Sequence, residues 1–207
     1  MTTDPARALP GRRRLLQGAA LALPTALLAG GTTSARPIPR ADYPGADWVP
    51  ASRTNRTGAD RPASHPVTHV VIHVTQTTYF GTLGIFQNPL QDVSAHYLVR
   101  SADGRVAQSV RDRDIAWHAG SWAYNERSIG IEHEGWVDEP EWFTDALYES
   151  SAALTAHLCA VHEIPVDREH IIGHNEVPGA THTDPGPLWD WDRYMRLVRK
   201  VPSPGPR

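Results

Sequence analysis

The chain has 207 residues, 40% of them hydrophobic and seven of them Trp, which is enough apolar material for one well-buried core. Its length predicts a single globular domain, and its lone Cys159 excludes an internal disulfide. The formal charge of −3, with no basic stripe, argues against nucleic acid as a partner.

The first 35 residues have the pattern of an export signal. Arg12 to Arg14 precede a Leu- and Ala-rich stretch from Leu15 to Ala29, and small residues follow up to Ala35. Paired arginines before such a stretch are typical of the twin-arginine route, which exports folded proteins. We therefore expect a signal peptide over residues 1–35 and a secreted mature protein, extracellular or in the cell wall, without stable membrane insertion. An uncleaved N-terminal anchor is the alternative, although Pro24 interrupts the stretch and leaves it short for a membrane span.

Residues 36–66 are rich in Pro, Arg and Ala, a composition that predicts a linker or an irregular N-terminal arm. The domain is then expected to start near Val67 and to occupy residues 67–207. Residues 1–35 carry four Arg and one Asp, a net +3, so their removal changes the formal charge from −3 to −6. This acidic balance again argues against nucleic acid.

Two elements follow in the first half of the domain. Thr68 to Thr75, THVVIHVT, is β-branched and mostly apolar, as expected of a strand buried on both faces, and His73 lies near its end. Residues 95–100 and 105–110 are expected to pair as a hairpin, because Gly104 between them readily takes a positive φ.

The next two elements are a strand and a long helix. Ser128 to Glu134, SIGIEHE, predicts a strand that contains Glu132. From Thr144 to about His162, leucines and other apolar residues recur at helical spacing, with Thr144 as the expected N-cap and Pro165 just beyond the end.

Ile171 and Ile172 predict another short strand, and Asp190 is expected to cap a last helix that continues through Val198. Strands and helices therefore interleave along the chain. This order predicts the α/β class, with one mixed sheet covered by helices.

The loop from Ile172 to Trp191 brings together three side chains that can bind a divalent metal: His174, His182 and Asp184. Imidazole nitrogen and carboxylate oxygen suit zinc, and a catalytic zinc usually has three protein ligands. His182 and Asp184 stand two apart, so in an extended backbone both leave on the same side, and the spacing leaves open which of them binds the metal. A Pro/Gly turn with solvated histidines is the alternative interpretation of this loop.

His170 and His174 stand four apart, the spacing of two zinc ligands on one helical face. Ile171, Ile172 and Gly173 between them favour strand and turn instead. We therefore expect His174 to be the ligand and His170 to be a surface or packing residue.

Five motifs occur along the chain: VIHVT at 71–75, SAHYLV at 94–99, AWHAG at 116–120, SIGIEHEG at 128–135 and GHNEVPGATHTDPGP at 173–187. Together and in this order they resemble the type 2 N-acetylmuramoyl-L-alanine amidases, zinc enzymes that share their fold with peptidoglycan recognition proteins. The resemblance implies a central mixed β-sheet flanked by helices, with zinc at the floor of a groove along the sheet. The implied substrate is the amide that joins the lactyl group of N-acetylmuramic acid to the L-alanine of the peptidoglycan stem peptide.

Carried over residue by residue, the resemblance makes His73, His174 and Asp184 the zinc ligands and Glu132 the catalytic acid and base. It places His182 at the rim of the site. Many members have a lysine at that position, where it can stabilise the oxyanion, whereas the single lysine here is the distant Lys200. His182 would then be the catalytic residue that donates a hydrogen bond to the oxyanion.

Further candidates for binding the substrate are His96, Trp117, His118, Arg127 and Asn175. Trp117 and His118 are expected to shape the groove, with a core Trp and a hydrogen-bonded His as the alternative, and Arg127 and Asn175 to meet stem-peptide carboxylates and amides. Some relatives have a tyrosine directly before the residue that matches His96, where this chain has Ala95.

Tyr79, Phe80 and Phe86 are expected to pack under the loop after the first strand. Two alternatives to a monomeric amidase remain: a peptidoglycan-binding protein of the same fold without activity, and a zinc peptidase acting on the stem peptide.

Overall fold

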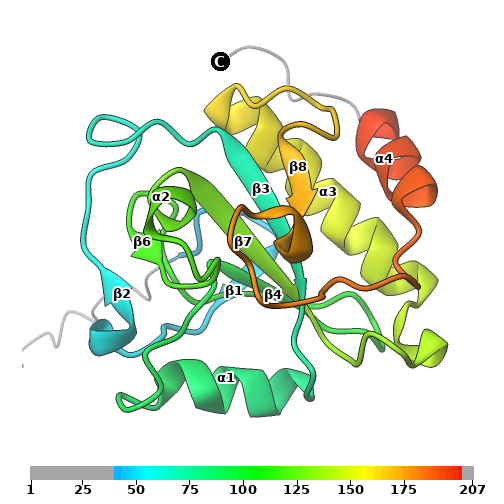
Figure 1. Ribbon diagram of the computed structural model, residues 1–207, viewed down its shortest axis with the longest axis horizontal. Helices are drawn as coiled ribbons and strands as arrows, with labels where there is room; N and C mark the ends of the chain where they lie inside the picture. The colour runs from blue at the N-terminus through cyan, green and yellow to red at the C-terminus, as the bar shows by residue number, and fades with distance from the viewer. Residues whose placement is uncertain (1–39, 202–207) are drawn as a thin grey trace, which may run out of the picture. The chain divides into compact units, whose positions relative to one another are not determined.

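The computed structural model describes residues 40–201, all of which fall in one compact unit (Figure 1). The expected signal peptide over residues 1–35 lies outside the described residues. No helix within the described range combines the length and the apolar character that a membrane span requires.

The strands are β1 (Ala46–Trp48), β2 (Arg56–Thr57), β3 (His69–Val74), β4 (Tyr97–Val99), β5 (Val106–Gln108), β6 (Ile115–Ala116), β7 (Ser128–His133) and β8 (Ile171–Gly173). The α-helices are α1 (Tyr79–Gln87), α2 (Trp122–Asn125), α3 (Asp145–His162) and α4 (Trp191–Lys200). Short 3-10 helices are η1 (Arg53–Asn55), η2 (Pro140–Trp142) and η3 (His174–Glu176).

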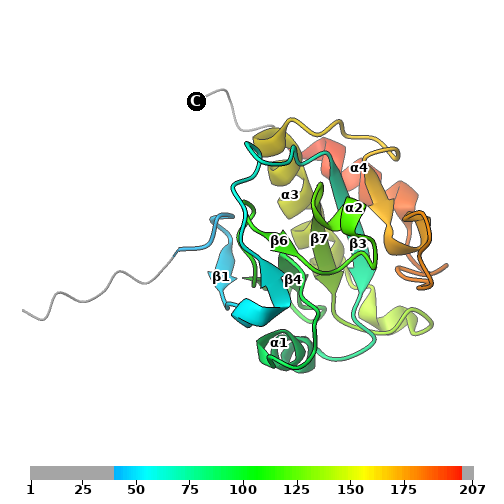
Figure 2. The same ribbon diagram turned by 60° about the vertical axis from the view of Figure 1, so that its left-hand side comes forward.

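The central sheet is mixed and flanked by helices, which confirms the predicted α/β class (Figure 2). Its strand order is β1-β5-β4-β7-β3-β8. β3 pairs in parallel with β7 and β8, and β7 pairs in parallel with β4, whereas β4 and β5 form the predicted antiparallel hairpin. β2 and β6 form a separate antiparallel pair.

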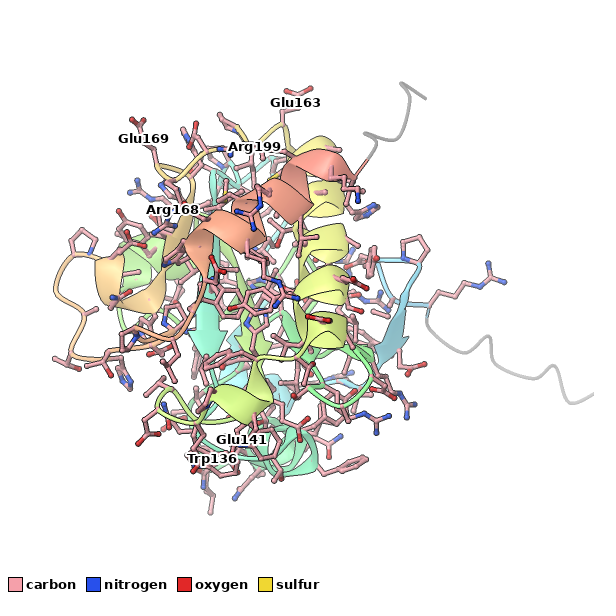
Figure 3. All side chains as sticks on the ribbon, turned by 90° about the vertical axis from the view of Figure 1, so that its right-hand side faces the viewer. Trp136, Glu141, Glu163, Arg168, Glu169 and Arg199 are labelled. Carbon is pink, nitrogen blue, oxygen red and sulfur yellow. The ribbon has the colours of Figure 1, made fainter. Side chains whose placement is uncertain are left out.

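The two faces of β3 pack against different layers. Val70 and Ile72 lie in the main core with residues of α3 and α4, which run side by side in Figure 3. Val71 lies on the opposite face with Ile172. Because alternate residues of a strand share a face, His73 projects on the same side as Val71. This second face therefore carries the residues of the predicted site.

The predicted caps of the two long helices are confirmed. The Thr144 side chain accepts a hydrogen bond from the Leu147 amide at 3.1 Å at the start of α3. The Asp190 carboxylate accepts one from the Arg193 amide at 2.8 Å at the start of α4. Gly104 in the hairpin has a φ of 69°, as its turn position requires.

Helix α1 is an element that the sequence pattern did not predict. It is apolar on every side, so it lacks the amphipathic period by which helices are recognised. Tyr79 and Phe86 are buried as expected, but Phe80 is 67% exposed, contrary to the expectation that it packs.

The prediction that residues 36–66 form a linker or irregular arm is wrong for part of that range. β1 adds a parallel strand to β5 in the central sheet, and β2 pairs with β6. The folded unit therefore begins before Val67. Strands of two or three residues are held by backbone pairing, so they show too little side-chain alternation to be recognised in the sequence.

Arg61, in this same segment, ties it to the rest of the domain. Its side chain is buried, and its guanidinium donates to the carbonyl oxygens of Asp112 at 2.7 and 3.0 Å, Glu126 at 3.2 Å and Ser128 at 2.9 Å.

We expect Arg61→Met to lower the free energy of unfolding by about 3 kcal/mol, because several buried acceptors lose their donor. Urea unfolding at neutral pH measures this change. The exposed Arg53→Met is the control and should stay within about 0.5 kcal/mol of the parent, and an equally small loss for Arg61→Met would contradict the prediction.

Candidate active site

The site is built where three parallel strands end side by side. His73 of β3 and Glu132 of β7 are direct neighbours in the register of the sheet. His174 begins η3 immediately after β8, the other neighbour of β3. Because all three strands run in the same direction, their carboxyl ends meet at one edge and bring these side chains together.

His73, His174 and Asp184 form one compact cluster. The Nδ1 atom of His73 lies 3.2 Å from Oδ2 of Asp184, and Nδ1 of His174 lies 3.0 Å from Oδ1. One potential ligand atom from each of the three residues lies within 4.8 Å of the others, and all three residues are buried. The geometry therefore brings the predicted ligands to one point.

The charges of this cluster suit a divalent cation. Burial raises the pKa of Asp184, but the His174 and His73 rings outweigh it and hold that pKa below its usual range. Burial lowers the pKa of His73 and outweighs the opposite effect of Asp184. Metal binding needs an ionised carboxylate and a neutral imidazole, and these are the forms that the shifts favour.

Glu132 lies beside this cluster, and its pKa is shifted in the opposite direction to that of Asp184. Its Oε2 atom is buried and has no hydrogen-bond partner within residues 40–201. Burial, followed by the nearby Asp184 carboxylate, raises the pKa of Glu132 well above its usual range. A carboxyl group with a raised pKa and a free oxygen is a candidate for proton transfer.

A cleft of about 470 Å³ opens over the cluster. The four residues above line it, together with Val74, Thr75, Gln76, Asp92, Val93, Trp117, His118, Gly120, Asn125 and His182. His182 is exposed and stacks on the ring of His174, with centroids 4.7 Å apart and an interplanar angle of 16°. His182 thus lies at the rim of the cleft, as the resemblance implied.

Comparison with known proteins agrees with this geometry. The family model described as N-acetylmuramoyl-L-alanine amidase matches residues 63–187, more than half of the chain. The chain belongs to this amidase family. The match confirms the resemblance that the five motifs indicated.

Two characterised relatives illustrate the similarity of the amidase to known enzymes. N-acetylmuramoyl-L-alanine amidase A of Achromobacter lyticus is 34% identical over 175 residues, which cover 76% of this chain and 95% of the relative. The 1,6-anhydro-N-acetylmuramyl-L-alanine amidase AmpD of Escherichia coli is 34% identical over 162 residues and 75% of each chain.

Solved structures show the same fold. A crystal structure of AmpD superposes with a TM-score of 0.61 at 30% identity, covering 74% of this chain and 94% of the other. The AmiD amidase of E. coli, solved with the substrate anhydro-N-acetylmuramic acid-L-Ala-D-γ-Glu-L-Lys, superposes with a TM-score of 0.55 at 27% identity. That match covers 64% of this chain and 57% of AmiD.

Trp117 and His118 of the amidase differ in their surroundings. Trp117 is half-buried at the cleft, and its indole N–H donates to Oγ1 of Thr57 at 3.0 Å. His118 is buried and hydrogen-bonded to His73, and it also lines the cleft, so it helps to shape the groove as a hydrogen-bonded histidine. Burial, followed by the neighbouring His73 and His96, lowers the pKa of His118 well below its usual range.

Three residues predicted to bind substrate lie outside the cleft. His96 is fully buried, with Nε2 lying 2.7 Å from Nη2 of Arg61. Arg127 is exposed just before β7, about a strand's length from Glu132 at the other end. Asn175 is exposed on η3 and is absent from the lining of the cleft. Motif position indicated proximity to the site, but the direction of each side chain is set by the fold.

Three further residues line the cleft but were not predicted from the sequence: Gln76, Asp92 and Asn125. Gln76 and Asp92 come from the segments on either side of α1, which was itself not predicted. Asn125 ends α2, and its Oδ1 accepts the backbone amides of His118 at 3.1 Å and Ala119 at 2.8 Å. These residues belong to none of the five motifs, and we find no signal in the sequence that marks them.

The buried His96 makes the stability of the amidase depend on pH. Burial, followed by the Arg61 charge, lowers the pKa of His96 well below 6.5. His96 therefore binds a proton in the unfolded chain but not in the folded chain. Stability is lost as pH falls below about 6.5. We expect this histidine to contribute a loss of roughly 1.4 kcal/mol per pH unit in that window. Urea unfolding at several pH values should show a smaller slope for His96→Asn, and equal slopes in the two proteins would contradict this.

Proposed function

We propose that this amidase uses a zinc ion held by His73, His174 and Asp184 to cleave the bond between the N-acetylmuramoyl lactyl group and L-alanine in peptidoglycan or its fragments. The observation that carries the proposal is the convergence of two imidazole nitrogens and a carboxylate beside Glu132, which carries a free oxygen. A peptidoglycan-binding protein without activity needs no such set of ligands and acid.

The residues present fit a zinc ion. A His₂Asp donor set with an adjoining cleft leaves a position for solvent or substrate, as catalytic zinc requires. Zinc bound there would supply Lewis acidity, lowering the pKa of a water molecule to about 7 and polarising the scissile carbonyl.

Glu132 transfers the proton in this proposal. Its Oε2 accepts a proton from the water that attacks the carbonyl and then delivers that proton to the departing alanine nitrogen. The amine leaves poorly unless it is protonated, so the raised pKa of Glu132 favours the second transfer. One carboxyl group therefore performs both transfers in sequence.

His182 is proposed to stabilise the oxyanion in place of the lysine found in many relatives. It is exposed at the rim and stacked on His174, so an N–H donor can reach toward the cleft. We expect His182→Ala to lower kcat by about 100-fold with little change in KM, because the interaction forms in the transition state. His182→Lys serves as the matched control and should retain most of the activity. Unchanged turnover in His182→Ala would remove this residue from the mechanism.

A digest of purified cell wall and of soluble muropeptides tests the main proposal. An amidase releases the amine of L-alanine and no reducing sugar. A chelator should abolish the release, and added Zn²⁺ should restore it. A new amine on another stem-peptide residue would indicate a peptidase, and the absence of any product would indicate a binding protein.

We also propose that the chain is exported by the twin-arginine route and acts as a monomer outside the cytoplasm. The support for export is the pattern of residues 1–35 described above. Replacing Arg12 to Arg14 by Lys should leave the protein in the cytoplasm, and continued export of the variant would contradict the route. Light scattering of the purified protein should give the mass of one chain.

A further inference from the structure

Three residues of the SIGIEHEG motif lie on one face of β7. Ser128, Gly130 and Glu132 alternate along the strand and therefore lie on the same side. The ring of His118 lies across this face, so close that a Cβ on Gly130 would come within 2.5 Å of its Cγ. Glycine thus makes room for His118 between Ser128 and Glu132.

His118 connects the backbone of α2 to the ring of His73. Its Nδ1 lies 2.9 Å from Nε2 of His73, and its Nε2 lies 3.2 Å from Oγ of Ser128. The Ser128 hydroxyl in turn donates to the carbonyl oxygen of Tyr124. The side chains that these hydrogen bonds connect, His73, His118 and Ser128, are all buried.

The carbonyl at the far end determines where each proton lies. A carbonyl oxygen can only accept, so Ser128 must donate its single proton to Tyr124 and accept from His118. His118 then carries its proton on Nε2, and in the neutral ring Nδ1 is an acceptor. His73 must therefore donate from Nε2 to His118, which leaves the lone pair of His73 on Nδ1.

This lone pair points at the proposed metal site. Nδ1 of His73 faces Oδ2 of Asp184 at 3.2 Å. Two acceptors that face each other across such a distance are stabilised by a cation between them. The arrangement of Tyr124, Ser128 and His118 therefore prepares His73 as a ligand before any ion arrives.

We propose that His118 is a positioning residue that fixes the tautomer and orientation of His73 for metal binding, through the chain of hydrogen bonds that ends at the Tyr124 carbonyl. The inference rests on the metal site proposed above. Hydrogen bonds to the second nitrogen of a ligating histidine typically change metal affinity by about 10- to 100-fold.

The test is the Zn²⁺ affinity of the metal-stripped full chain, measured by competition with a chromophoric chelator. His118→Leu removes the acceptor for His73 and should weaken binding by about 10- to 100-fold. His118→Asn can offer its carboxamide oxygen near the position of Nδ1 and should recover most of that loss. Urea unfolding without metal checks that each variant is folded. Equal affinity in His118→Leu and the parent, or no recovery in His118→Asn, would overturn the proposal.

A pair of serine variants gives an independent answer if His118→Leu does not fold. Ser128→Ala frees the tautomer of His118 and should weaken zinc binding. Ser101→Ala removes another buried serine hydroxyl that donates to a carbonyl, that of Trp142 at 2.6 Å, outside the cleft, and should leave zinc affinity unchanged. Equal effects of the two serine changes would contradict the proposal. Failure of the parent itself to bind zinc would also reject the proposed function, whereas tight binding by both parent and His118→Leu rejects this inference alone.

Discussion

Glu132→Gln is expected to lower kcat for release of the L-alanine amine by about 1,000-fold, with zinc affinity close to that of the parent. Gln preserves the size of the side chain but can neither take a proton from water nor deliver one to the leaving nitrogen. The prediction rests on the unpartnered Oε2 and the raised pKa of Glu132. The measurement is steady-state turnover of a soluble muropeptide, combined with the chelator competition.

Glu141→Gln is the matched control, because Glu141 is exposed on η2 and does not line the cleft. Its turnover should equal that of the parent. If Glu132→Gln keeps more than about a tenth of the parent activity, the proton must be transferred by another group.

Asp184→Ala is expected to abolish activity and to remove the stabilisation that zinc confers. The change deletes the carboxylate that faces both histidine rings and also accepts the Val74 amide at 3.3 Å. A ligand that binds the folded state at 100 times its Kd adds about 2.7 kcal/mol to the free energy of unfolding. Urea unfolding with and without Zn²⁺ should show such a gain for the parent and almost none for the variant.

The exposed Asp192→Ala, on α4, serves as the control for loss of a carboxylate far from the cleft. It should retain both activity and the gain in stability with zinc. An equal gain for Asp184→Ala and the parent would mean that the ion binds elsewhere.

The two predictions separate the roles of the two carboxylates. The histidine rings around Asp184 hold its pKa below the usual range, whereas burial and the charge of Asp184 raise the pKa of Glu132. Two neighbouring carboxyl groups with oppositely shifted pKa values are typical of a site in which one holds a charge and the other moves a proton.

Patterns that repeat within a short segment were predicted well. β3 is a largely apolar run because both of its faces are buried, and α3 shows the helical period because only one side of it is buried. The helix caps at Thr144 and Asp190 followed from the hydroxyl and carboxylate that accept backbone amides. Each of these features is decided by residues close together in the sequence.

Features held by distant backbone contacts were missed. β1 joins the sheet through pairing with β5, and Arg61 binds carbonyl groups that lie more than 50 positions away. Helix α1 is capped by Thr78 but has no polar face that would mark it in the sequence. Local composition carries no information about such partners.

The sequence by itself determined the family and predicted the metal ligands and the acid, because these depend on residue types at particular positions in recognisable motifs. The tertiary structure decided which neighbours of those motifs enter the cleft. His118 lines the cleft packed against His73, His96 is enclosed beside Arg61 outside the cleft, and Asn125 reaches the cleft from outside any motif. The physical reason is that a motif specifies chemistry along the chain, whereas the direction of a side chain depends on the sheet register and on the space left by neighbours such as Gly130.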